Sequence, residues 1–523
     1  MSGLGEWEIH RTAVMGIHAA LLNSGQVLLF SYPSKFEDED EHDPQHRHSV
    51  LGSASYRGEY ELLNPSDWST TTATESQRQK LQRNIFCGGT CFLGNGDLFS
   101  SGGQYQAIHN PLLLFDPPST YNYTFSISTG WKKRTRMFFT AARWYPTCLT
   151  LPNGDALIIS GASGLYGIKQ LGPFSFVNRD LQLYNHISRT LSTLQKIPFK
   201  IGLYPFMHLL PSGAVFIHSG TTTRLYNPAN NNWIKKPGSS LLLEKETNYR
   251  YSRINPVQGS SVLLPLLLES FPKYRARVML IGGGGESEDP HGDTPATDTC
   301  EIIDFGESDP EWKNTSKMNF RRVMPDAVLL PDGNILVVNG CEKGKSDDGK
   351  DPVMVPELFD TRYNSWTKLA PMQVPRLYHA TAILLPDARV MTAGTDREWN
   401  KGEGIRDEYR VEIFTPPYLT QSPRPTIKNV GKHEVLYGEE VQVDCDSGEE
   451  VAMSTLVRPS SVTHSLNTDQ RCVGLEITKT NKNSISVKMP QESILAPQGY
   501  YMLFIVNTAG RPSRSVMIRI RSA

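Results

Sequence analysis

The most informative segment of the sequence is Leu330-Pro331-Asp332-Gly333-Asn334-Ile335-Leu336-Val337-Val338-Asn339-Gly340. An apolar residue and a proline come first, Asp-Gly makes a turn, and a run of apolar residues follows and stops at small ones. Two short strands joined by a tight polar turn with glycine form a β-hairpin. We therefore interpret this stretch as the centre of a β-hairpin.

The same pattern recurs along the chain. An interrupted version with a longer insertion spans residues 262–264 and 277–283, and further copies occupy residues 21–30, 92–99, 151–159, 210–217 and 385–391. About seven units at a spacing of roughly 50–70 residues lie close to the kelch repeat, whose period is about 50. Radial repetition leaves only short, protected sheet edges. The sequence therefore predicts an all-β protein with a seven-bladed kelch-type β-propeller at residues 1–414.

The repeat stops after Gly394, and a different architecture follows. Prolines within residues 414–425 indicate a linker. Short apolar strands then recur, for example at residues 441–443, 484–487 and 501–506. About 100 residues of this kind predict an immunoglobulin-like β-sandwich, which we place at residues 415–523.

Composition and charge narrow the class of protein. The 523 residues are 38% hydrophobic and 20% charged, which is typical of a soluble globular protein. The formal net charge is -1, whereas a protein that binds nucleic acid normally presents a basic face. No apolar window approaches the roughly 18 residues of a membrane helix. We expect no nucleic-acid or membrane partner, and a monomer.

The cysteines and the N-terminal residues give information about the cellular compartment of the protein. Seven cysteines, an odd number without a CxxC pair, indicate neither a disulfide framework nor a zinc site. Residues 1–8 lack the basic start and apolar stretch of a secretory signal. The chain is therefore expected to be either cytoplasmic or a form whose leader is not shown. The charged segment 37–48 is interpreted as a solvated loop rather than a metal site.

Four places carry side chains suited to chemistry. Tyr378-His379 and Trp144-Tyr145 lie in the same phase of two repeats, just before a strand, so they should converge on one end of the propeller axis. Cys87 precedes another repeat strand, and His464 lies at a polar hairpin tip in the last domain. Each has an ordinary explanation alone, because tyrosines pack and a buried free thiol is common.

Together these residues resemble a known family. Phe86-Cys87, Trp144-Tyr145, Tyr378-His379 and Thr463-His464 are similar to the copper radical oxidases, the family of galactose oxidase and glyoxal oxidase. The match lies in their order, their spacing relative to the blades, and the last histidine outside the propeller. It covers nearly the whole chain, and residues 143–146 and 322–326 look closer to glyoxal oxidases than to galactose oxidase.

The resemblance implies a role for each residue. Cys87 and Tyr145 would form a thioether-linked tyrosyl radical, a cofactor made from the protein's own side chains. One copper ion would be bound by Tyr145, His379 and His464 in the equatorial plane, with Tyr378 as the axial ligand. Galactose oxidase stacks a tryptophan on the modified tyrosine, but the position in step with it here is Ser163. That shield is either absent or supplied from elsewhere, with Trp144 as the candidate.

The chemistry requires residues of these types. Two imidazoles and a phenolate suit the tetragonal preference of Cu(II). A free tyrosine has a pKa of about 10, so the metal must stabilise the tyrosine anion at neutral pH. Tyr378 would accept the proton of the substrate hydroxyl as a general base. The oxidised Cys87–Tyr145 pair would accept the second electron that Cu(II) cannot hold.

The first functional hypothesis is therefore an oxidase. It would convert a small aldehyde, glyoxal-like or methylglyoxal-like, to an acid, or a primary alcohol to an aldehyde, and reduce O2 to H2O2. The alternative is a non-catalytic kelch-type binding or scaffold protein, and a third is an intact but unprocessed metal site. The resemblance implies a secreted protein. Phe206, Met207 and His208 are predicted to line the entrance.

Overall fold

The fold is known from a computed structural model. It describes residues 3–32, 58–66, 79–80, 85–103, 121–136, 142–163, 177–270, 273–285, 294–346, 348–396, 408–420 and 423–523. The charged segment 37–48 lies outside these residues.

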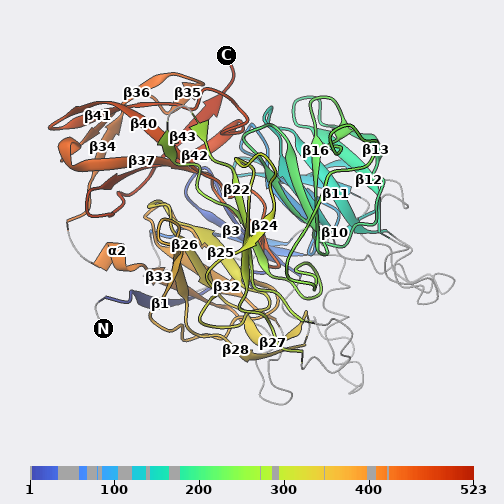
Figure 1. The fold of residues 1–523 in the computed structure, drawn as a ribbon. Coiled ribbons are helices and arrows are strands. Elements are labelled where there is room, and N and C mark those ends of the chain that lie inside the picture. The colour runs from blue at the N-terminus through green and yellow to red at the C-terminus, as the bar shows by residue number, and fades with distance from the viewer. Residues whose placement is uncertain are drawn as a thin grey trace.

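Seven antiparallel blades make up the larger part of the described chain, so the predicted β-propeller is confirmed (Figure 1). Blade one is β2 (His18–Leu21), β3 (Val27–Ser31), β4 (Glu59–Leu63) and β5 (Gln79–Lys80). Blade two is β6 (Gly89–Phe92), β7 (Leu98–Ser101), β8 (Tyr121–Ser126) and β9 (Gly130–Arg136). Blade three is β10 (Trp144–Thr150), β11 (Ala156–Ala162), β12 (Asp180–Asn185) and β13 (Thr190–Lys196).

The next three blades have the same order of strands, with additions. Blade four is β14 (Phe206–Leu209), β15 (Val215–Ser219), β16 (Thr222–Asn227) and β17 (Asn232–Trp233), with β18 (Glu244–Glu246) beside β16. Blade five is β19 (Ser260–Leu263), β22 (Arg277–Ile281), β23 (Cys300–Asp304) and β24 (Trp312–Asn314), interrupted by the hairpin β20 (Leu268–Ser270)–β21 (Lys273–Tyr274). Blade six is β25 (Asp326–Leu329), β26 (Ile335–Val338), β29 (Glu357–Asp360) and β30 (Ser365–Lys368), with the hairpin β27 (Cys341–Lys345)–β28 (Asp348–Pro352).

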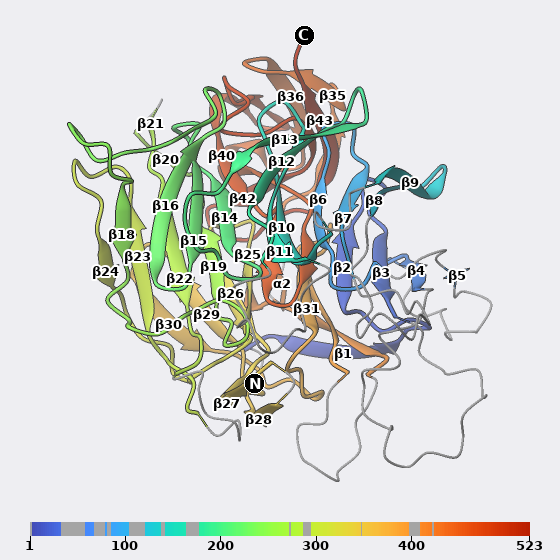
Figure 2. The same cartoon turned by 90° about the vertical axis from the view of Figure 1, so that its right-hand side faces the viewer.

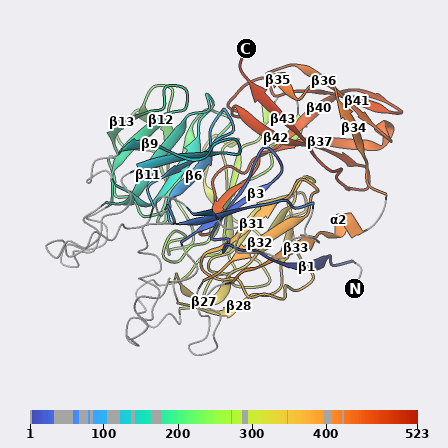
Figure 3. The ribbon, with the colours of Figure 1, turned by 180° about the vertical axis from the view of Figure 1, so that it is seen from behind.

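Both ends of the propeller sequence meet in the seventh blade. Its strands are β31 (Ala380–Leu384), β32 (Val390–Gly394), β33 (Arg410–Thr415) and the N-terminal β1 (Glu6–Arg11). β1 pairs antiparallel with β33, from Glu6 opposite Thr415 to Arg11 opposite Arg410. Figure 3 shows the N-terminal strand lying along this blade. The ring is therefore closed by hydrogen bonds between the two ends of the repeat.

Each sequence repeat is the inner hairpin of one blade. Residues 330–340 form the turn after β25 and the strand β26, and the turn glycine, Gly333, has a φ of 88°, which glycine adopts at little cost. All residues of β26 are buried, because both faces of an inner strand lie against neighbouring blades. Figure 2 shows the inner strands β6, β10 and β14 of successive blades side by side.

Buried ion pairs fix the segments that enter the inner strands. Arg322 pairs with Glu357 at 3.1 Å, and both side chains are 0% exposed. Arg253–Glu301 and Arg376–Glu412 repeat this arrangement, at 2.9 and 3.5 Å. In each pair the glutamate belongs to the third strand of the same blade. Because a buried charge is costly without its partner, these pairs lock the approach to three inner strands.

The C-terminal part is the predicted immunoglobulin-like β-sandwich. Its strands pair in the order β34-β36-β41-β40-β37-β42-β43-β35. They are β34 (Ile427–Val430), β35 (Glu434–Leu436), β36 (Glu440–Cys445), β37 (Val451–Val457), β40 (Cys472–Asn481), β41 (Ser484–Lys488), β42 (Gly499–Asn507) and β43 (Val516–Arg521). The helices α2 (Pro417–Thr420) and η5 (Gly448–Glu450) are short. The domain division at residues 414 and 415 stays a proposal. Among the described residues, no helix is long and apolar enough to span a membrane.

One hairpin of the C-terminal part joins the propeller. β38 (Ser461–Thr463) pairs with β2, placing Thr463 opposite His18, and β39 (Leu466–Asn467) pairs with β38. His464 and Ser465 form the turn, with φ values of 50° and 61°. The Gln258 side-chain amide donates a hydrogen bond to the His464 carbonyl at 2.8 Å. A residue from the second architecture is thereby held at the propeller axis.

Candidate metal centre

The segments that enter the inner strands share an unusual backbone conformation. Cys87, Tyr145, Tyr204, Met324 and His379 have φ values of 65°, 63°, 47°, 60° and 64°. Non-glycine residues rarely adopt a positive φ, and such strain gathers at functional sites. Because the conformation recurs at the same point of five blades, it directs side chains from successive blades toward one end of the axis.

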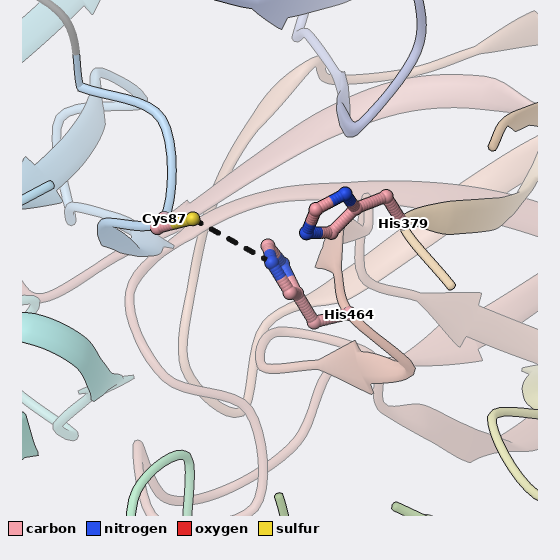
Figure 4. A group of neighbouring side chains, drawn as sticks. All are labelled: Cys87, His379 and His464. Atoms are coloured by element: carbon pink, nitrogen blue, oxygen red, sulfur yellow. Dashed lines mark hydrogen bonds between the residues drawn. The ribbon is translucent and has the colours of Figure 1, made fainter. Parts of the chain in front are cut away.

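Three of the five side chains selected from the sequence form a compact group of potential metal ligands. The sulfur of Cys87 and ring nitrogens of His379 and His464 all lie within 4.8 Å of one another, and all three residues are buried. Cys87 Sγ is 3.7 Å from His464 Nε2, and Figure 4 shows the two histidine rings close together, with the thiol on the side of His464. The ring centroids of the two histidines are 4.4 Å apart, at 79°.

Two tyrosines complete what we call the metal-ligand group: Cys87, Tyr145, Tyr378, His379 and His464. The hydroxyls of Tyr145 and Tyr378 are hydrogen-bonded to each other. Tyr378 stacks on His379 with ring centroids 3.8 Å apart, and the Tyr145 ring lies 4.8 Å from that of His464. All five selected residues therefore lie together, although they come from three blades and the C-terminal hairpin.

Neighbouring groups orient both histidines. His379 Nδ1 lies 2.7 Å from a carboxylate oxygen of Asp396, whose other oxygen accepts the Tyr32 hydroxyl at 2.7 Å. His464 Nδ1 is 2.5 Å from Thr463 Oγ1. His379 therefore donates its Nδ1 hydrogen to the carboxylate, which leaves Nε2 as a lone-pair donor. A carboxylate behind a histidine is the usual support of a metal ligand.

These residues fit copper. His379 Nε2 is buried and has no hydrogen-bond partner among the described residues, so a bound metal would satisfy it. Two imidazole nitrogens with two phenol oxygens form a donor set that suits Cu(II). Asp396 and Tyr32 were not selected from the sequence, where no pattern marks either residue.

His18 fixes the thiol segment and was also missed. Its Nε2 accepts a hydrogen bond from the Cys87 backbone N–H at 3.1 Å, and its ring stacks on Phe30 at 4.4 Å. Burial, and then the electrostatic interaction with the neighbouring His379, lower the pKa of His18 to about 3. His18 is therefore neutral and able to accept this hydrogen bond at ordinary pH. The only signal in the sequence is its place at the start of an inner strand.

Two aromatic rings cover Tyr145. Trp144 stacks on it with ring centroids 3.7 Å apart at 15°, and Tyr204 stacks on it at 4.5 Å and 23°. Trp144 therefore occupies the stacking role for which Ser163 has no ring. Tyr204 was missed, although Tyr204-Pro205 repeats Tyr145-Pro146 one blade later.

The expected entrance residues lie elsewhere. Phe206, Met207 and His208 are all buried, and His208 Nε2 is 2.7 Å from Ser261 Oγ. His208 lines a cavity shared with the C-terminal part, next to Arg471. The prediction that these three residues line the entrance is wrong, because all of them are buried, and β14 ends at Leu209, whose carbonyl accepts a hydrogen bond from Arg471.

Comparisons with known proteins agree over nearly the whole chain. Residues 65–418 match the family described as glyoxal oxidase N-terminus, and residues 424–520 match the galactose oxidase-like early set domain. An aldehyde oxidase GLOX of Vitis pseudoreticulata is 27% identical, with 97% of this chain and 96% of that protein covered. A galactose oxidase of Gibberella zeae is 27% identical, over 99% of this chain and 71% of that protein. A fungal alcohol oxidase of the AA5 family, solved in complex with copper, shares the fold, with a TM-score of 0.74, 20% identity and 99% of both chains covered.

Proposed function

Because this chain belongs to the glyoxal oxidase family and is thereby related to the copper radical oxidases, we propose that it oxidises a small aldehyde or a primary alcohol with dioxygen. The observation that carries the proposal is the buried group of Cys87, His379 and His464 with the hydrogen-bonded Tyr145 and Tyr378. The protein would act as a monomer on a small molecule, with hydrogen peroxide as the second product.

The copper ligands would be Tyr145, Tyr378, His379 and His464. Bound copper supplies a one-electron acceptor and a Lewis acid for the substrate oxygen. His379 is held for this role by Asp396, and His464 by Thr463. The packing of the propeller holds these four side chains in place, because each belongs to a segment that enters an inner strand or to a tight turn.

Cys87 would be joined to the ring of Tyr145 by a thioether. The Tyr145 N–H donates to the Cys87 carbonyl at 3.1 Å, and His18 fixes the Cys87 backbone, so the two segments that the thioether would join are adjacent. The cross-link replaces one S–H and one ring C–H bond by a C–S bond. Dioxygen takes the two hydrogens and becomes hydrogen peroxide. The linked ring then serves as the second one-electron acceptor.

Each turnover would be a two-electron oxidation of the substrate. An aldehyde hydrate plus O2 gives a carboxylic acid plus H2O2, and a primary alcohol plus O2 gives an aldehyde plus H2O2. Tyr378 would accept the proton of the substrate hydroxyl as the general base. Its hydrogen bond to Tyr145 keeps the two phenol oxygens adjacent, so the proton acceptor lies beside the oxidised ring. Two relatives are named aldehyde oxidases, one of them matched over 97% of this chain and 96% of its own length, and these names favour an aldehyde as substrate.

Peroxide release tests the proposal. The copper-loaded protein is assayed with methylglyoxal, glyoxal and galactose, beside Cys87→Ser and Cys148→Ser. The second variant removes a buried thiol outside the metal-ligand group and is the matched control. We expect peroxide from the wild type and Cys148→Ser, and almost none from Cys87→Ser. Stoichiometric copper binding without turnover by the wild type would instead support the non-catalytic kelch-type binding protein.

A further inference from the structure

Tyr204 lies against the proposed radical ring without being one of its implied ligands. It is fully buried, and its ring is stacked on Tyr145 with centroids 4.5 Å apart. It also lies 5.1 Å from His464, again measured between ring centroids. None of the roles implied for copper or for the thioether uses this side chain.

Tyr204 and Trp144 lie on opposite faces of Tyr145. Both rings are nearly parallel to it, at 23° and 15°, and both centroids lie within 4.5 Å. Two rings stacked over one face at these separations would overlap each other. The Tyr145 ring, which is buried, is therefore enclosed between two aromatic planes.

The chain holds Tyr204 in this position at two points. Its N–H donates to the Tyr145 carbonyl at 2.9 Å, and its hydroxyl donates to the Gly88 carbonyl at 3.2 Å. Gly88 follows Cys87, so Tyr204 contacts both segments that the thioether would join. Tyr204 also has the left-handed backbone of the ligand-bearing segments, with a φ of 47°.

A stacked, electron-rich ring stabilises an electron-poor neighbour, because π faces are negative and attract positive charge. Oxidation removes one electron from the Tyr145 ring, and Tyr204 then faces a ring with reduced electron density. Tyr204 itself keeps its electron. Its hydroxyl is bonded to a carbonyl, which cannot take up the proton that a phenol loses when it is oxidised.

We propose that Tyr204 is a positioning residue of the radical centre, which stabilises oxidised Tyr145 by stacking on the face opposite Trp144. The inference rests on the proposed function, because it concerns the same oxidised ring. In this arrangement Tyr145 is enclosed between Trp144, from the same strand, and Tyr204, from the next blade.

The test compares Tyr204→Leu with Tyr204→Phe in the copper-loaded protein. Phenylalanine keeps the ring and loses only the hydroxyl, whereas leucine loses the ring. Redox titration of the tyrosyl radical absorption gives the midpoint potential, and the decay of this absorption gives the lifetime. Tyr184→Leu is the matched control, because Tyr184 is a buried tyrosine stacked on Phe99 at 4.5 Å and 26°, outside the metal-ligand group.

We expect Tyr204→Leu to shift the one-electron equilibrium toward the reduced ring by about three- to tenfold. That shift corresponds to a rise of about 30–60 mV in the midpoint potential. The radical lifetime should fall with it, while Tyr204→Phe and Tyr184→Leu stay within about twofold of the wild type. The thioether, seen as the loss of two hydrogens by mass spectrometry, should form in all three variants.

Two results would overturn the inference. One is an unchanged potential and lifetime in Tyr204→Leu that binds copper and carries the thioether. The other is a loss in Tyr204→Phe as large as that in Tyr204→Leu, which would assign the effect to the hydroxyl. If leucine prevents folding, Tyr204→Met takes its place with the same expectation, because methionine fills irregular space. A wild type without any radical absorption would refute the proposed function itself, and the two failures are thereby distinguished.

Discussion

The carboxylate behind His379 should control copper affinity. Asp396 and His379 are 1% exposed or less, and the Asp396 oxygen lies 2.7 Å from His379 Nδ1. Replacing Asp396 with asparagine keeps the shape and an oxygen acceptor but removes the negative charge. The imidazole then becomes less basic at Nε2, and its ring is held less firmly.

The expected loss of copper affinity follows from the loss of the contact between Asp396 and His379. Mutating such a partner typically costs about 10- to 100-fold in metal affinity. We expect about 10-fold for Asp396→Asn, which keeps a neutral acceptor, and about 100-fold for Asp396→Ala, which keeps none. These factors correspond to about 1.4 and about 2.7 kcal/mol.

The copper dissociation constant can be measured by competition with a chromophoric chelator. Asp155→Asn is the matched control, because Asp155 lies at the same 2.7 Å from Nδ1 of His186, in a pair outside the metal-ligand group. Its copper affinity should equal that of the wild type. Tyr32→Phe, which removes a neutral hydrogen bond to Asp396, should have an effect smaller than that of Asp396→Ala. A folded Asp396→Ala protein that binds copper as tightly as the wild type would refute the reasoning.

Two further predictions concern stability. Burial raises the pKa of Asp326 to about 8 in the folded protein, against 3.8 as its ordinary value, so its contribution is fully present below pH 3.8 and is lost as pH rises through 8. Between pH 6 and pH 8 the wild type should lose about 2 kcal/mol relative to Asp326→Asn, and a difference in melting temperature that does not change with pH would contradict this. Arg322→Met should lower the free energy of unfolding by about 3–5 kcal/mol, because Glu357 is left buried without its partner. Arg322→Met with Glu357→Met should recover most of that loss in denaturant unfolding, whereas equal losses would argue against an effect of the unpaired charge.

The repeat could be predicted from the sequence because a hairpin is a local structure. A polar turn with glycine between two apolar strands is recognisable within a short stretch, and seven such stretches indicate a ring of blades. The phase of the repeat also placed Tyr145 and His379 at equivalent strand entries, where the structure brings their side chains together. The role of each in binding copper stays a proposal.

Contacts between blades could not be predicted in this way. Asp396 reaches His379 from the loop after β32, and Tyr32 follows β3 in another blade. Tyr204 covers Tyr145 from the next blade, although its own dipeptide offered a signal. The entry segments have a positive φ, which depends on tertiary support rather than on local preference.

Short-range patterns were enough to predict the seven hairpins and the change of architecture after Gly394, and a resemblance carried by a few short motifs pointed to the residues of the metal-ligand group. The pairing of β38 with β2, which carries His464 to the propeller axis, depends on tertiary packing instead. Tertiary packing also sets which rings enclose Tyr145, and it leaves His379 Nε2 without a hydrogen-bond partner among the described residues. The physical reason is that these contacts join residues up to several hundred positions apart, and their geometry is set by the packing of blades against one another.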